Sequence, residues 1–227
     1  MKRVRTILGM GVSLLLMVGW VACRREPTAL ELLTSAANNL STATSLQFSI
    51  ERQGEPIEIP LPLVTVGVLG ADGAYQAPGN IHAVIKAQVG DSQPEADALW
   101  RDGKSYFKFP PFLVNYIQLD LGESFNVPAL FSTNLGIPAM LLRMNNVSVG
   151  TVEEVAGQNA YRISGTSTGE DLSGLVGLPM APGEATVEAW VSKDTRELIR
   201  IIVTESDGSG WVLDFFGYNE PVEIPTP

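Results

Sequence analysis

The chain has 227 residues, a hydrophobic fraction of 45% and a formal net charge of −10. That hydrophobic fraction is large enough for a folded domain with a real core, which excludes a disordered tether. The acidic balance argues against nucleic acid as a partner, because phosphates attract clustered lysine and arginine. The single cysteine excludes an internal disulfide.

Residues 1–22 are typical of a secretory signal peptide. Three basic residues lie in the first five positions, and an uncharged apolar run extends from Ile7 to Ala22. The run is shorter than the roughly 20 residues that a membrane-spanning helix needs, so a retained span is the weaker interpretation. Removal of this segment takes away three of the 15 basic residues and none of the 25 acidic ones, which leaves a net charge of −13.

The sequence Val21-Ala22-Cys23 resembles the lipobox of bacterial lipoproteins, although Trp20 stands where that pattern prefers leucine. In such proteins the cysteine sulfur receives a diacylglycerol, the chain is cut before it, and the new amino terminus is acylated with a chain such as palmitate. We therefore expect a lipidated Cys23, a short linker over residues 23–27, and a protein anchored to the cell membrane on its extracytoplasmic side. Two or three acyl chains anchor stably, because each buried methylene contributes about 0.8 kcal/mol. Signal cleavage without lipidation is the alternative.

The first half of the mature chain predicts one helix followed by strands. Thr28 and Glu31 form a capping box, and leucine and alanine recur at helical spacing over about 29–43. From Ser45 onward apolar and polar residues alternate, which indicates a half-buried strand. The proline-rich "EPIEIPLPL" predicts a loop or an irregular edge. Further strands are expected at Val64–Leu69 and Ala74–Gln76, around an Asp72-Gly73 turn, and at Ile81–Val89.

Hairpin signals dominate the rest of the chain. Asp102-Gly103 stands between two strand-like runs, and that dipeptide is favoured in two-residue turns. Later strands are expected at Val147–Val155, Asn159–Thr168, Glu184–Ser192, Leu198–Glu205 and Ser209–Phe216. The total of about nine to eleven strands predicts an antiparallel meander that curls into a barrel or part-barrel. We expect residues 28–227 to form a single domain.

One segment breaks the β pattern. Residues 125–146 contain a single charged residue, Arg143, and Pro128 and Pro138 suit the first turns of two short helices. The segment has too many apolar groups for a surface helix with one buried stripe. Glu170–Leu178 predicts another short, largely apolar helix. These helices either fill an ordinary core or help to enclose a cavity for a hydrophobic ligand, and periodicity does not distinguish the two.

If a cavity exists, its wall is expected in these helices and its entrance in the adjoining loops. The wall candidates are Leu130, Phe131, Leu135, Ile137, Met140, Leu141, Met144 and Leu175. Methionine suits such a wall because its flexible thioether adapts to varied acyl chains. The entrance candidates are Phe112, Tyr116 and Phe125. The loops at 60–64 and 109–116 are expected to gate entry.

Enzymatic chemistry has little support in this sequence. The only histidine, His82, lies in an alternating strand on the face opposite Ile81, where a solvated polar residue is expected. One cysteine and one histidine, far apart, do not supply a zinc site. Asp91, Glu95 and Asp97 lack the dense ligand spacing of a calcium loop and predict a solvated acidic turn. We expect no catalytic residues, no metal and no cofactor.

The order of several motifs resembles the LppX/LprAFG family of mycobacterial lipoproteins. After the lipobox come "A-x-x-L-L-x-x-A", "S-L-Q-F-S", "W-x-D-G-x-x-Y", "G-x-x-A-Y-R-I-S-G-T", "V-x-A-W-V" and "F-x-x-Y-N-E-P-V-x-I-P". They occupy Ala29–Ala36, Ser45–Ser49, Trp100–Tyr106, Gly157–Thr166, Val187–Val191 and Phe215–Pro225. The resemblance implies an α+β half-barrel, a curled antiparallel sheet with helices on its concave face around a hydrophobic cavity. That fold is similar to the periplasmic carriers LolA and LolB.

The resemblance also implies a function. Family members hold acylated lipids and glycolipids in the cavity and help to move them through the cell envelope, so we expect a lipid-anchored carrier with an acylated lipid or glycolipid as ligand. A membrane transporter is a possible partner, and the protein is expected to be a monomer. The alternative is a non-transporting interaction or sensor module that uses the same fold to hold a protein partner. A hydrolase of lipid or glycan would need a polar constellation that this sequence does not show.

Overall fold

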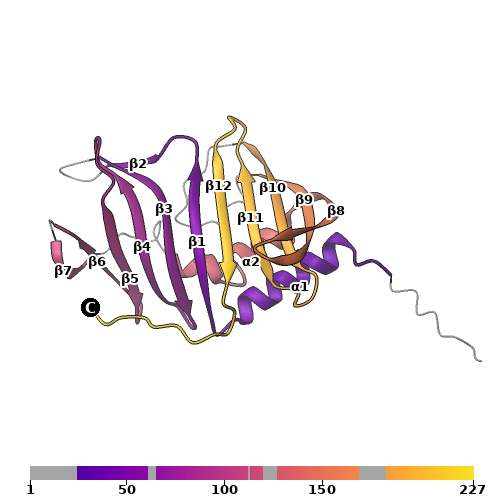
Figure 1. Cartoon of the computed structure of the whole chain (residues 1–227), viewed down its shortest axis with the longest axis horizontal. Coiled ribbons are helices and arrows are strands. Elements are labelled where there is room, and N and C mark those ends of the chain that lie inside the picture. The colour runs from indigo at the N-terminus through magenta and orange to yellow at the C-terminus, as the bar shows by residue number, and fades with distance from the viewer. Residues whose placement is uncertain (1–24, 61–64, 112, 120–126, 169–182) are drawn as a thin grey trace, which may run out of the picture.

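The computed structural model describes residues 25–60, 65–111, 113–119, 127–168 and 183–227. Their strands form one 12-stranded antiparallel sheet (Figure 1). The strands are β1 (Ser45–Gln53), β2 (Ile57–Pro60), β3 (Thr65–Gln76), β4 (Asn80–Gln88), β5 (Glu95–Arg101), β6 (Lys104–Phe109), β7 (Leu113–Gln118), β8 (Asn145–Val155), β9 (Gln158–Thr168), β10 (Glu184–Ser192), β11 (Leu198–Thr204) and β12 (Gly210–Phe216). The helices are α1 (Ala29–Thr42), the 3₁₀ turn η2 (Val127–Phe131) and α2 (Ile137–Arg143).

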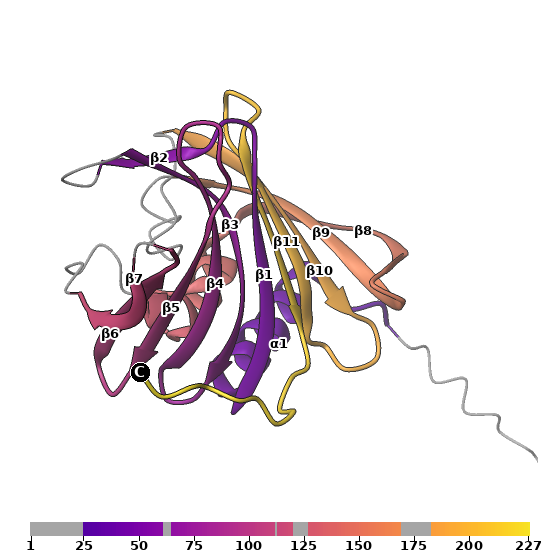
Figure 2. The same ribbon diagram turned by 60° about the vertical axis from the view of Figure 1, so that its left-hand side comes forward.

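Two meanders make up the sheet, and they meet at its centre. The strand order is β7-β6-β5-β4-β3-β1-β12-β11-β10-β9-β8, with β2 paired to the remaining part of β3. The first strand of the chain therefore pairs with the last one, and β7 and β8 lie at opposite edges. The segment that joins β7 to β8 includes η2 and α2, so these helices lie on the path from one edge of the sheet to the other. Figure 2 shows the sheet curving round the helices, which gather on its concave side.

The helix α1 begins where the capping residues predict. The Thr28 hydroxyl accepts a hydrogen bond from the Glu31 amide, and the Glu31 carboxylate accepts one from the Thr28 amide at 2.7 Å. These two bonds satisfy donors that lack partners at the start of a helix. The face that α1 turns toward the sheet is buried, and its residues are Ala29, Leu32, Leu33, Ala36, Ala37 and Leu40.

The two faces of the sheet differ in chemistry. On the concave, inner face the strands carry buried aliphatic and aromatic side chains that form one core cluster with the helices. On the outer face a polar row crosses the central strands. The Arg200 guanidinium donates to Asp214 at 2.6 Å, and the Ser49 hydroxyl donates to Asp72 at 2.6 Å, in strands whose register places all of these residues side by side. The alternation in the sequence thus separates an apolar inner face from a polar outer face.

The half-barrel fold is confirmed, because the sheet is curved and open and has helices on one face. The described residues form 12 strands where about nine to eleven were expected for the chain. One extra strand is β7, which replaces most of the loop predicted over 109–116, and another is β2, a short strand within the predicted irregular edge. The expected turn at Asp72-Gly73 is wrong, since β3 runs through it and pairs on both sides, with β1 and with β4. The predicted helix at 170–178 lies outside the described residues.

Candidate functional site

The strand register sets apolar residues in rows across the inner face. One row runs from Phe48 in β1 through Gly73 and Ala83 to Ala98 and Phe107 in β6. Side chains in such rows share one face of the sheet and together present a continuous apolar surface. The candidate site is this inner surface together with the helices that lie against it.

Half of the inner face is closed by packing. The inner residues of β10, β11 and β12 include Val187, Ile201 and Leu213, each with an exposed fraction of 0%. The helix α1 contacts β10 and β11 and also packs against α2. This half is therefore a filled core.

Most of the predicted wall residues lie in that core. Leu130, Phe131, Ile137, Met140, Leu141 and Met144 are at most 8% exposed and belong to the main core cluster. Leu135, between η2 and α2, is 57% exposed and does not join them. Leu175 lies outside the described residues. The structure thus brings six of the eight candidates together, and their contact with a ligand stays a prediction.

The other half of the inner face is less completely buried: Ile81 and Ala98 are 0% exposed there, but four neighbouring apolar residues are not fully covered. Val68, Ala71, Ile85 and Phe107 are only partly buried, yet they pack against the main core cluster. The gradient is clear along one row, where Ile50 in β1 is 6% exposed while the next two residues, Ala71 and Ile85, are half-buried. An apolar surface that is neither solvated nor fully covered is suited to an apolar ligand. We name these four residues the open apolar patch.

The open apolar patch was missed in the sequence. The alternation of Ile81, Ala83 and Ile85 indicates which face of that strand is apolar. It does not indicate how much of the face the helices cover, because that depends on their position in three dimensions. Sequence reasoning therefore named the helical residues and not the strand residues opposite.

An aromatic cluster lies between the closed and open halves. The Phe131 ring of η2 stacks on Tyr75 with centroids 4.4 Å apart, and its centroid is 5.7 Å from that of Phe48. Gly73 makes room for this arrangement, since a Cβ at that position would lie 2.6 Å from Cζ of Phe48. Burial raises the pKa of the Tyr75 hydroxyl, so this group stays neutral.

A buried ion pair lies at one end of the inner face. Nη1 of Arg52 is 2.5 Å from Oε1 of Glu205, and the two side chains are 6% and 3% exposed. Arg52 also donates to the Ser209 hydroxyl at 2.9 Å, and its guanidinium lies 5.2 Å from the centroid of the Trp211 ring. These contacts tie the end of β1 to the β11–β12 turn.

Of the three entrance candidates, Tyr116 alone lies among the described residues. Phe112 and Phe125 lie outside the described residues. Tyr116 lies in β7, where its neighbour Ile117 pairs with Phe107 of the inner face. Alternation places Tyr116 on the outer face, and Nζ of Lys108 lies 5.6 Å from its ring centroid. Desolvation raises the pKa of the Tyr116 hydroxyl.

The polar groups of the outer face form ion pairs. Nε2 of His82 is 3.2 Å from Oδ1 of Asp97, and Nζ of Lys108 is 3.1 Å from the other carboxylate oxygen. Within the part of the chain that the structure describes, no three histidine, cysteine or acidic residues are grouped to hold a metal ion. Within the same residues, no helix is long and apolar enough to cross a membrane.

Comparisons with known proteins agree with this geometry. The family model for LppX_LprAFG lipoproteins matches residues 26–224. The structure is similar to that of LprF from Mycobacterium bovis, with a TM-score of 0.69 and 17% identity over 88% of this chain and 96% of that one. It is also similar to the lipoprotein LppX from Mycobacterium tuberculosis, with a TM-score of 0.61 and 18% identity over 87% of this chain and 98% of that one. A search of curated protein sequences finds no match.

Proposed function

Because the chain belongs to the LppX_LprAFG lipoprotein family, we propose that it binds an acylated lipid or glycolipid on its inner face and carries it through the cell envelope. The observation that supports this proposal is the open apolar patch of Val68, Ala71, Ile85 and Phe107. These side chains lie in three rows of the inner face, beside a packed core, and are only partly covered. The acyl chains of the ligand would bury the part of the open apolar patch that the helices do not contact.

Binding follows from partition of acyl chains out of water. Burial of apolar surface stabilises the complex by about 25 cal/mol per Å² removed from water. The patch consists of strand side chains whose backbone is fixed by pairing on both sides, so the wall is formed before the ligand arrives. Such preorganisation lowers the entropy that binding costs.

The anchor proposed at Cys23 gives the carrier access to its ligand. A diacylated cysteine keeps the protein at the membrane surface, where acyl chains transfer without crossing a layer of water. The net charge of −13 calculated after residue 22 is too acidic for a polybasic grip on anionic lipid, so attachment depends on the acyl chains.

Two alanines of β3 provide a matched test. Ala71 points to the inner face and Ala74 to the outer face, and both are half-buried. We would purify the chain from the membranes of its expression host and measure bound lipid by native mass spectrometry followed by organic extraction. Ala71→Trp is expected to remove most of the bound mass, because the indole fills the open apolar patch. Ala74→Trp is expected to leave it unchanged.

A lipid-free protein that stays free after incubation with diacyl and triacyl lipids would contradict the proposal. Equal loss of lipid in both variants would contradict the assignment of the patch, provided that both variants keep the unfolding temperature of the parent chain.

The alternative function, an interaction module, is favoured by one observation. The edge strand β7 and the residue that follows it carry Val114, Ile117 and Leu119 with exposed fractions of 66%, 37% and 36%. Exposed apolar residues on an edge strand suit the addition of a strand from a partner protein. A lipid-free chain whose solution complex with a partner is lost on Val114→Lys would support this function in place of the carrier.

A further inference from the structure

The helices on the concave side of the sheet have an exposed side of their own (Figure 2). It carries three leucines, Leu30 in α1, Leu135 in the turn before α2 and Leu142 in α2, with exposed fractions of 61%, 57% and 46%. Because α1 and α2 pack against each other, these leucines belong to one layer. Leu135 is also the described wall candidate that the core does not use. We name the exposed side of α1, α2 and the turn between η2 and α2 the helix-layer surface.

The helix-layer surface is nearly uncharged. Among its described exposed residues only Glu31 and Arg143 are charged, and their charges are opposite; the others are the three leucines and threonine or asparagine residues such as Thr34 and Asn38. The outer face of the sheet instead carries ion pairs, of which the Arg200–Asp214 pair is one. A chain with a net charge of −13 after residue 22 is repelled by anionic lipid head groups. A neutral surface is therefore the side on which the protein meets the least repulsion from a membrane.

The two charged residues of this surface are compatible with a bilayer. The Glu31 carboxylate accepts hydrogen bonds from the Thr28 amide at 2.7 Å and the Thr28 hydroxyl at 2.9 Å, so its charge is engaged within the cap. Arg143 follows Leu142 at the end of α2 and is exposed. A leucine next to an arginine suits the boundary between lipid and water, because the apolar side chain enters the lipid while the guanidinium reaches the phosphates.

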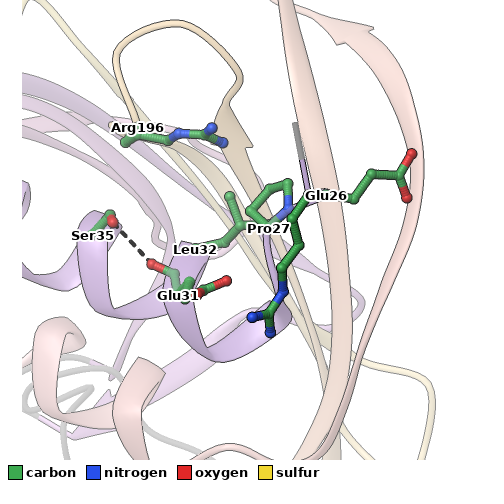
Figure 3. A pocket seen from close by; sticks show the side chains of 7 residues that line it. Glu26, Pro27, Glu31, Leu32, Ser35 and Arg196 are labelled. Atoms are coloured by element: carbon green, nitrogen blue, oxygen red, sulfur yellow. Dashed lines mark hydrogen bonds between the residues drawn. The ribbon is translucent and has the colours of Figure 1, made fainter. Parts of the chain in front are cut away.

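The proposed anchor at Cys23 holds this surface close to the membrane. Five residues, 24–28, separate Cys23 from the first residue of α1. So short a segment spans at most about 20 Å. Figure 3 shows Glu26 and Pro27 directly before the first turn of α1. Leu30 lies in that turn, and α2 packs against α1, so an anchored Cys23 keeps the helix-layer surface within reach of the lipid head groups.

We propose that the helix-layer surface lies against the membrane that holds the Cys23 anchor, with Leu30, Leu135 and Leu142 in the interfacial region of the lipids. The proposal rests on that anchor. Three leucines bind a bilayer only weakly by themselves, but the anchor makes their docking an intramolecular step, so a weak contact is enough to set the orientation. In this orientation the concave side of the sheet, which carries the open apolar patch, faces the bilayer, and the polar outer face is turned to water.

Spin labels at two matched positions test this orientation. Leu142 on the helix-layer surface is 46% exposed, and Phe216, which alternation places on the outer face, is 47% exposed. Because Cys23 is the only cysteine, an acylated chain with Leu142→Cys or Phe216→Cys has one free thiol for a nitroxide label. The full chain is purified from the membranes of its expression host and reconstituted into vesicles of phosphatidylcholine and phosphatidylglycerol. Electron paramagnetic resonance then measures collisions of each label with oxygen, which concentrates in lipid, and with a water-soluble nickel chelate.

We expect the ratio of oxygen to nickel collisions to be several-fold higher for Leu142→Cys than for Phe216→Cys. Equal ratios would overturn the proposal. Shielding of the Leu142→Cys label from both oxygen and nickel would also overturn it, because that result would indicate a protein partner or a second copy on this surface. Leu30→Cys and Leu135→Cys are expected to resemble Leu142→Cys, and either replaces it if the latter lowers the unfolding temperature.

The outcome is separable from that of the lipid-carriage experiment. The labels report orientation whether or not the inner face holds lipid, so a lipid-free chain is expected to give the same contrast between the two positions. Loss of the contrast would leave the bound lipid measured by mass spectrometry unchanged. A chain that does not float with the vesicles would overturn the anchor at Cys23 and this proposal with it.

Discussion

Replacement of Arg52 by methionine tests how much the buried ion pair contributes to the stability of the fold. The guanidinium of Arg52 and the carboxylate of Glu205 are almost entirely removed from water. Methionine keeps much of the apolar stem of arginine, so the change mainly removes charge and hydrogen bonds. The bonds lost include those to the Ser209 hydroxyl at 2.9 Å and the Gly210 carbonyl at 3.3 Å.

The size of the effect follows from burial. Removal of one partner of a buried ion pair costs about 3–5 kcal/mol, because the other charge stays out of water without its counterion. We therefore expect Arg52→Met to lower the free energy of unfolding by at least about 3 kcal/mol. Replacement of Glu205 by leucine in the same chain removes the stranded charge. The double variant is expected to be at least about 1 kcal/mol more stable than Arg52→Met.

Urea unfolding followed by tryptophan fluorescence measures these differences. Arg162→Met is the control, because the Arg162–Glu188 pair is 42% and 23% exposed and such pairs contribute about 0–1 kcal/mol. Equal losses in Arg52→Met and Arg162→Met would refute the reasoning from burial. A double variant whose loss is the sum of its two single losses would show that the charges are not coupled.

Three further changes test other parts of the fold. Gly73→Ala places a Cβ 2.5 Å from the backbone oxygen of His82 and 2.6 Å from Cζ of Phe48, and overpacking of this kind is expected to lower the free energy of unfolding by about 1–3 kcal/mol in urea titrations. Thr28→Ala removes the cap of α1 and is expected to cost about 1 kcal/mol, with faster amide exchange confined to the first turn of that helix. Hydrogen bonds from Lys86 and Ser49 lower the pKa of Asp72 in the folded chain. The Asp72 carboxylate therefore contributes fully to the free energy of unfolding above the ordinary aspartate pKa of about 3.9, and this contribution is lost as the pH falls through its lower pKa in the folded chain. Asp72→Asn is expected to make the free energy of unfolding fall less steeply as the pH is lowered.

Local signals in the sequence account for most of the elements. The capping box at Thr28 and the Asp102-Gly103 dipeptide depend only on the hydrogen bonds and backbone angles of neighbouring residues. The helix and the hairpin that they predict are both present. The dipeptide Asp72-Gly73 carries the same turn signal and yet lies within β3. There the two neighbouring strands satisfy the backbone groups on both sides, and the missing side chain of Gly73 makes space for Phe48. A single sequence does not show whether a glycine is needed for a turn or for close packing.

The candidate site was predictable only in part. The apolar character of residues 127–144 indicated burial, and the structure places most of that segment in the core. Which part of the inner face stays open is decided by contacts between distant segments, such as Phe131 on Tyr75.

The pairing of the first strand with the last has a consequence for how the chain folds. Most neighbours within each meander are consecutive strands joined by short loops, such as β5 and β6 or β11 and β12, and such hairpins close quickly. The seam between β1 and β12 is different, since Ile50 pairs with Leu213, 163 positions later. Its formation is expected to be the slow step, and until then each meander exposes its own apolar rows. The inner face comes into existence only when the seam closes, so a variant that weakens β1–β12 pairing is expected to lose any bound lipid before it loses its hairpins.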